Sequence, residues 1–130
     1  MLNLWGNKTL KNLPKIQADR ILAGFTNIET IGEGLKCKEL DLSANKVLKI
    51  LPKMEAERIF ANNTNIQSIE DGLKCGYLNL YANKMLKKFP RNFEVGELNL
   101  KGTYFSETHT EAEIRKKIKA KNGTVGKIWI

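Results

Sequence analysis

Apolar and polar positions along this chain repeat with a period of 19, and one extra residue is present only in the fifth copy. Each copy opens with an apolar residue, at Leu2, Ile21, Leu40, Ile59, Leu78 and Leu98. A second apolar residue follows two positions later, which is the alternation of a short strand with one buried face. So short a period predicts a solenoid, in which no single copy can bury its apolar face and stacking supplies the core.

A polar residue, Asn or Thr, stands five positions after each opening residue, at Asn7, Thr26, Asn45, Thr64, Asn83 and Thr103. We expect these side chains to hydrogen-bond the backbone of the turn and of the neighbouring copy, because buried polar groups need partners. The strands should stack in parallel, about 4.8 Å apart, as a sheet on the concave side of the solenoid. About a dozen residues remain for each return path, which favours extended or 3₁₀ segments over α-helix on the convex side.

The copies alternate between two types, so the duplicated unit is a pair of copies. The segment LDLSANK at positions 40–46 returns as LNLYANK at positions 78–84. All three prolines, Pro14, Pro52 and Pro90, are separated by the same step of two copies. We infer that the chain grew by duplication of such a pair.

The third copy carries a motif that points to a known family. It reads Cys37-x-x-Leu40-x-Leu42-x-x-Asn45-x-x-Leu48, which resembles the leucine-rich-repeat signature L-x-x-L-x-L-x-x-N-x-L with its last apolar residue one position late. With Leu-Pro after the asparagine turn, the unit is most similar to the short repeats of bacteria and bacteriophages. The resemblance extends over roughly the whole chain and implies a leucine-rich-repeat fold, which serves as a general binding surface.

The last residues depart from the repeat. We expect residues 1–107 to form the solenoid, with five full copies and a partial sixth, and residues 108–130 to form a C-terminal capping helix and a terminal strand. Thr110 and Glu113 make a capping-box pattern ahead of Ile114 and Ile118, and a helix over the last coil covers the open end of a solenoid. No comparable segment precedes residues 2–4. We therefore expect an open N-terminal edge strand, able to pair with a partner or with a second copy in a homodimer.

Several function classes are disfavoured by the residues present. Cys37 and Cys75 lie two copies apart, about 10 Å, which is beyond disulfide reach and indicates two buried core residues. No apolar run is long enough for a bilayer and the N-terminus does not resemble a signal peptide, so we expect a cytoplasmic protein without membrane attachment. The single histidine, His109, has no Cys, Asp or Glu at ligand or triad spacing, and no phosphate-binding loop is present. We expect no enzyme activity, no metal and no cofactor.

Charge offers one alternative function. The formal net charge is +8, and lysines recur in two columns, Lys8, Lys46 and Lys84 followed by Lys11, Lys49 and Lys87. These columns and the basic C-terminal tail at residues 115–121 could bind nucleic acid. No aromatic residues interleave with the lysines, however, and long charged side chains also keep loops and the convex face soluble. The second interpretation is the favoured one.

The residues that flank the inward pair of each strand should point away from the core, and they define three outward columns. The first column contains Met1, Arg20, Glu39, Arg58, Tyr77 and Glu97, and the central column contains Asn3, Leu22, Asp41, Phe60, Asn79 and Asn99. The third contains Trp5, Gly24, Ser43, Asn62, Tyr81 and Lys101. The charges of this grid sum to zero, so the positive excess must lie elsewhere and the sheet is poorly suited to a polyanion.

Aromatic and apolar residues occupy several of these outward positions, which is typical of a protein-binding surface. The predicted partner-binding residues are Trp5, Arg20, Leu22, Asp41, Arg58, Phe60, Asn62, Tyr77, Asn79 and Tyr81. Cross-strand stacking that only stabilises the sheet is the structural alternative. We expect a non-enzymatic protein that blocks or sequesters a partner protein through its concave face. The phage-type resemblance makes an inhibitor of a bacterial host or defence protein the specific expectation, with nucleic-acid binding and self-association as alternatives.

Overall fold

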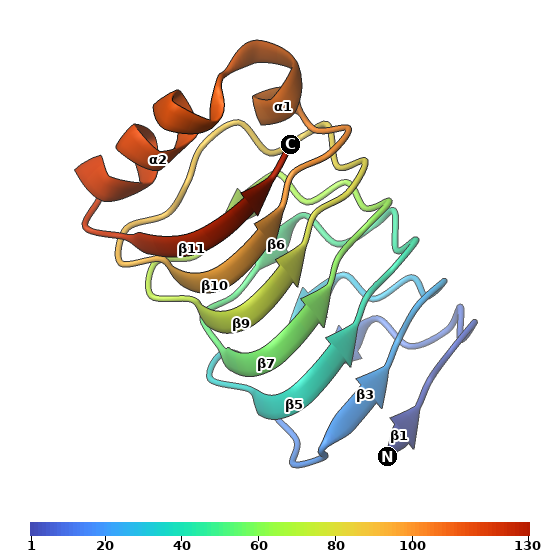
Figure 1. Cartoon of the computed structure of the whole chain (residues 1–130). Helices are drawn as coiled ribbons and strands as arrows, with labels where there is room; N and C mark the ends of the chain where they lie inside the picture. Colours follow the sequence, from blue (N-terminus) through green and yellow to red (C-terminus); the bar gives the residue numbers. More distant parts are fainter.

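The computed structural model describes residues 1–130 as a parallel β-solenoid with a short helical segment near its C-terminal end (Figure 1). Seven parallel strands form the main sheet in the order β1-β3-β5-β7-β9-β10-β11. Their bounds are β1 Leu2–Asn3, β3 Arg20–Leu22, β5 Lys36–Asp41, β7 Glu55–Phe60, β9 Lys74–Asn79, β10 Glu94–Asn99 and β11 Thr124–Trp129. The opening residues of successive copies are paired across the sheet, as in Ile21 opposite Leu40 and Leu40 opposite Ile59. The period of the repeat is therefore the strand-to-strand step, as predicted.

The return side of the solenoid is extended, as the shortness of each copy predicts. Two small parallel sheets lie there, one pairing β2 (Asn12–Leu13) with β4 (Thr30–Ile31) and the other pairing β6 (Ile50–Leu51) with β8 (Ser68–Ile69). Turns connect these short strands to the main sheet. Because no helix lies on this side of the repeats, each copy remains short enough for the tight stacking that the core requires.

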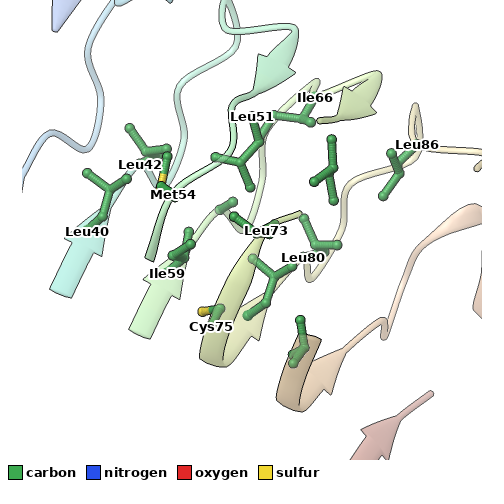
Figure 2. Close-up of a cluster of buried hydrophobic side chains, with 14 of the residues drawn as sticks. Leu40, Leu42, Leu51, Met54, Ile59, Ile66, Leu73, Cys75, Leu80 and Leu86 are labelled. Carbon is green, nitrogen blue, oxygen red and sulfur yellow. The ribbon is translucent and has the colours of Figure 1, made fainter. Parts of the chain in front are cut away.

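A single core runs through the stacked copies. Twenty-nine buried apolar side chains belong to one continuous cluster. Figure 2 shows how it is built: Leu40, Leu42 and Ile59 enter from the main sheet, while Leu51 and Ile66 enter from the return side. No copy closes this core alone, because each side chain packs against those of the copies on either side.

The Asn/Thr column lies in the interior and makes the hydrogen bonds predicted for it. The Asn45 Oδ1 accepts from the backbone N–H groups of Val47 and Leu48, each at 2.8 Å. Its Nδ2 donates to the Thr26 Oγ1 at 3.2 Å and to the Ile28 carbonyl at 3.0 Å. Asn83 repeats three of these four hydrogen bonds one duplication later, with Thr64, Met85 and Leu86. The column therefore closes each turn and also joins neighbouring copies, which offsets the cost of burying an amide.

The C-terminal segment differs in part from the prediction. The capping helix is confirmed as α2 (Glu111–Ala120), which begins at a capping box between Thr110 and Glu113, and it follows a shorter helix, α1 (Tyr104–Thr108). The terminal strand β11 is a full member of the main sheet and pairs in parallel with β10. The two helices are thus the crossover between β10 and β11 rather than part of a separate capping unit. A parallel neighbour requires such a crossover, because a tight turn can join only antiparallel strands.

The other edge of the sheet is β1, which pairs only with β3. Leu2 and Leu4 remain half-buried at this edge. The Trp5 indole lies over Gly24, where a Cβ atom would come within 2.3 Å of the ring. Glycine at this position therefore creates the space that the indole occupies.

Candidate partner-binding surface

The face of the main sheet that points away from the core, here called the outer face, contains the three predicted columns. Strand pairing aligns Arg20, Glu39, Arg58, Tyr77 and Glu97 in the first column. It aligns Asn3, Leu22, Asp41, Phe60, Asn79 and Asn99 in the central column. The alignment follows from the constant offset between copies, since a shift of one residue would turn each apolar pair out of the core.

Three aromatic residues from the neighbouring strands β7 and β9 and the turn after β9 form the centre of this face, and we call them the aromatic cluster. Phe60 ends β7, Tyr77 lies in β9, and Tyr81 follows the end of β9. The Phe60 and Tyr77 rings meet edge to face, with centroids 5.9 Å apart. Phe60 is opposite Asn79 in the sheet, so Tyr77 and Tyr81 are its two diagonal neighbours. The Tyr81 side chain is 46% exposed despite its size. Phe60 and Tyr77 are half-buried, so Tyr81 presents most of the aromatic surface of the cluster to solvent.

Trp5 was predicted to belong to the same binding surface, but the structure places it apart from the aromatic cluster. It follows β1 at the edge of the sheet, three strands and about 14 Å from β7. Its ring contacts Phe25, with centroids 5.2 Å apart, and is 49% exposed. Only a partner that spans several strands could contact both Trp5 and the cluster.

The charged residues of the first column are paired within the chain. Arg20 and Arg58 lie on either side of Glu39, with Nε–Oε distances of 2.8 Å and 3.4 Å. The Glu39 side chain is only 12% exposed, whereas both arginines are about half-exposed. The shared carboxylate holds the two guanidinium groups in place and leaves most of their N–H donors facing solvent. Exposed pairs of this kind add about 0–1 kcal/mol to stability, so their main effect is to orient the arginines.

Asp41 and Asn79 have local roles that their place in the outward grid did not reveal. The Asp41 Oδ1 accepts from the backbone N–H of Ser43 at 2.9 Å and from its hydroxyl at 2.6 Å. The Asn79 Oδ1 accepts from the backbone N–H of Tyr81 at 2.9 Å. Each side chain thus shapes the end of its strand, as Asx turns do, and Asn79 fixes the backbone that carries Tyr81. Leu22 and Asn62, also predicted as contact residues, lie half-buried on the same face.

The structure adds outer-face residues that the sequence analysis missed. Because β11 joins the sheet, Lys127 extends the first column and Trp129 extends the central one. The Trp129 Nε1 donates to Glu97 at 3.3 Å, and the Lys127 Nζ lies 3.7 Å from the ring centroid. The sequence did contain a signal for this strand: Val125 and Ile128 are three positions apart, as are Val95 and Leu98, with which they pair in the sheet.

An open groove of about 640 Å³ lies beside the aromatic cluster, over the first halves of β5, β7 and β9. Lys36, Glu55 and Lys74 line it, and the Lys36–Glu55 pair is 3.5 Å apart. Neighbouring side chains of opposite charge keep this part of the face close to neutral. A partner could therefore approach without a large charge penalty from either sign.

Both cysteines line the same groove from the core side and remain free thiols. Burial raises the pKa of Cys75 to about 12, and the Cys75 thiol donates to the Tyr77 carbonyl at 2.9 Å. Burial, followed by the charge of Glu39, also raises the pKa of Cys37. Protonated thiols are poor nucleophiles and poor metal ligands. Both cysteines pack against the core, but only Cys75 is buried as predicted, whereas Cys37 is half-buried. Each is paired with Ala56 on β7, so the two cysteines lie two strands apart.

Elsewhere, His109 joins the two helices and packs against Phe105, with ring centroids 5.7 Å apart. No three His, Cys, Asp or Glu side chains are arranged to hold a metal ion. Neither helix has the length and apolar character needed to cross a membrane.

No protein family, curated protein or solved structure matches the chain. Function is therefore inferred from the geometry of the outer face and from the repeat itself.

Proposed function

We propose that the protein is a non-enzymatic binding module of leucine-rich-repeat type, which engages a partner protein through the outer face of its main sheet. The aromatic cluster, in which Tyr81 is exposed and Phe60 and Tyr77 are half-buried, carries this proposal. Tyrosine and tryptophan are enriched among the residues that dominate protein interfaces, because they supply large contact area at low conformational cost. A rigid parallel sheet adds to this advantage, since little order has to be gained on binding.

The dimensions of the face suit such a role. Seven strands span about 29 Å, and a six-residue strand is about 20 Å long, so the face covers roughly 600 Å². A standard interface buries about 800 Å² on each partner. Contact with the outer face and one set of flanking turns would therefore suffice for a specific complex.

The charges around the cluster favour specificity over general attraction. Glu39 holds Arg20 and Arg58 in place, and their remaining N–H groups can donate to a carboxylate of the partner in a defined orientation. A partner that lacks this carboxylate would leave the donors facing apolar surface, at an energetic cost.

The mode of action that we propose is occlusion. Occlusion requires only a binding surface, and we expect the protein to block or sequester its partner in the cytoplasm. The resemblance of the repeat to phage and bacterial arrays supports a bacterial host or defence protein as the target.

The proposal is tested by comparing the wild-type protein with a Phe60→Glu/Tyr81→Glu variant in capture from nuclease-treated bacterial lysate, followed by calorimetry with the purified partner. Ile50→Glu/Met85→Glu is the matched control, because it replaces two exposed apolar residues outside the outer face. Loss of one aromatic anchor costs about 2 kcal/mol or more, which is roughly 30-fold in affinity. We expect the sheet variant to lose at least about 100-fold and the control to bind as wild type.

Thermal unfolding of all three proteins shows whether the substitutions preserve the fold. A folded sheet variant that retains wild-type affinity would contradict the proposal, as would equal losses in the sheet variant and the control.

A further inference from the structure

The positive charge of the chain is concentrated at the C-terminal end of the solenoid. Residues 1–83 contain eleven basic and nine acidic side chains, whereas residues 84–130 contain eleven basic and five acidic ones. The second of these segments, although much the shorter, therefore carries six of the eight net positive charges. Positive charge spread evenly along the chain would indicate a role in solubility alone. Its concentration in residues 84–130 indicates a specific function for this region.

Along the first four copies, acidic side chains lie beside the lysines of one column, Lys11 and Lys49. The Glu29 N–H donates to the Lys11 carbonyl at 2.7 Å, and Glu29 and Glu70 line the same return-side groove as Lys49. In the other column the intervening residues are Asn27 and Asn65, whose amides donate to the Lys8 and Lys46 carbonyls. A polyanion that follows the column of Lys11 and Lys49 would therefore meet carboxylates, which makes this column a poor nucleic-acid surface in this part of the chain.

At the C-terminal end of the solenoid, helix α2 takes the place of a further copy. One cavity of about 260 Å³ is lined by Lys87 and Lys88 from the fifth copy, by Lys117 from α2 and by Lys121, which caps the end of α2. We call this group the lysine cluster. The Lys121 Nζ donates to the Phe89 carbonyl at 2.8 Å, which holds the helix end against the fifth copy. None of the four lysines takes part in an ion pair.

No acidic side chain lines the cavity of the lysine cluster, although Glu113, one of the five acidic residues in this region, has a charge that interacts with one of its members, Lys117. Glu94 pairs with Lys74, Glu107 with Lys84 and Glu111 with Arg115. Glu97 accepts from Trp129, and Glu113 caps α2 through the Thr110 N–H. The cluster thus presents an excess of positive charge around a cavity several times the volume of a water molecule, which is about 30 Å³.

We propose that the lysine cluster binds phosphate groups of a double-stranded nucleic acid backbone. Lysines act as mobile point charges for phosphate, and they are depleted at protein–protein interfaces. A bilayer is a poorer fit, because the apolar residues of α2, Ile114 and Ile118, are buried in the core and cannot insert. The cavity's own aromatic residues, Phe89 and Phe105, are buried too and cannot stack on unpaired bases.

Binding through backbone phosphates has a measurable signature. It is independent of base sequence, and the logarithm of affinity falls with the logarithm of salt concentration by about 0.9 for each phosphate neutralised. Four contacts predict a slope of about −3.6, or a loss of roughly 150-fold between 50 and 200 mM salt. These lysines lie outside the outer face, so this binding and the proposed protein binding stand or fall separately.

The test is fluorescence anisotropy with a labelled DNA duplex of about 20 base pairs, using wild type, Lys88→Gln/Lys117→Gln and Lys11→Gln/Lys49→Gln. Both variants remove two charges, and Lys11 and Lys49 occupy the same repeat position as Lys87. We expect the cluster variant to lose more than tenfold in affinity at 50 mM salt, with a slope shallower by about 1.8. The column variant should change affinity by less than about threefold.

Equal losses in the two variants would show that net charge alone attracts DNA and would overturn the proposal. Absence of duplex binding by wild type would also overturn it. Competition by phosphatidylserine vesicles or by polyglutamate at least as strong as by unlabelled duplex would do the same, in favour of a membrane or an acidic protein. Retention of duplex binding by Phe60→Glu/Tyr81→Glu would separate this site from the outer face.

Discussion

Replacement of Asn45 by alanine should destabilise the protein far more than the same replacement at Asn7, although both asparagines occupy the same repeat position. Asn45 is fully buried and makes four hydrogen bonds, two with backbone N–H groups, one with a carbonyl and one with Thr26. Alanine would leave the Leu48 N–H and the Ile28 carbonyl without partners in the core. Each unsatisfied buried group costs about 1–3 kcal/mol, so we expect a loss of about 4 kcal/mol in the free energy of unfolding.

Asn7 provides the matched control because its surroundings differ while its local geometry is the same. Its Oδ1 accepts from the Thr9 and Leu10 N–H groups at 2.9 Å and 3.0 Å. It lies half-buried in the first copy, and Thr9 is exposed, so water can replace part of what alanine removes. The net value of a hydrogen bond that water can replace is about 0.5–1.5 kcal/mol. We therefore expect a loss of about 1 kcal/mol for Asn7→Ala.

Urea unfolding followed by circular dichroism measures both losses, provided that the dependence on urea concentration is unchanged. In thermal unfolding, a loss of 4 kcal/mol corresponds to a midpoint lower by about 15 °C for a chain of this length. Equal costs at the two positions, within about 0.5 kcal/mol, would refute the reasoning. The amide would then serve only its own turn, and its hydrogen bonds to the neighbouring copy would add nothing.

Three further predictions concern packing, protonation and capping. Because the pKa of Cys75 is raised from 9.0 to about 12, stability from its protonated thiol is complete below pH 9 and is lost as pH rises toward 12. The loss is up to about 4 kcal/mol, and unfolding curves of Cys75→Ala should lack this component. Gly126→Ala would place a Cβ 2.4 Å from the Gly96 carbonyl oxygen; since backbone cannot yield, we expect a loss of about 2 kcal/mol and faster amide exchange in β11. Thr110→Ala removes the α2 cap and should cost about 1 kcal/mol in urea unfolding, with unchanged stability contradicting a capping role.

Most of the fold was predictable because a constant offset between copies determines which residues are neighbours. That offset alone predicts Leu40 beside Ile59 and Glu39 beside Arg58, and both pairs are neighbours in the sheet. Where the offset changes, prediction was poorer. Leu98 is paired with Ile128, a longer step along the chain than between any two copies, and the helices between them hid the membership of β11 in the sheet.

The candidate site was predictable as a set of outward positions but not as a set of contacts. The columns identified Phe60 and Tyr77 as neighbours, and their rings do meet. The columns could not show that the Asp41 carboxylate accepts hydrogen bonds from Ser43, because the rotamer of a short polar side chain depends on the local turn. Nor could they show that Trp5 lies over Gly24, which depends on the path of the chain after the strand ends.

The sequence by itself therefore determined the period, the strand register, the inward and outward faces and the hydrogen-bonding column, because each follows from local alternation repeated at a fixed step. Only the tertiary structure decided which basic side chains have an acidic neighbour. Arg20 and Arg58 share one carboxylate, whereas the lysines of α2 and of the fifth copy meet without one. The physical reason is that α2 is oriented by the burial of Ile114 and Ile118 on the last coil. This packing, rather than any repeat, brings lysines from distant parts of the sequence to the same cavity.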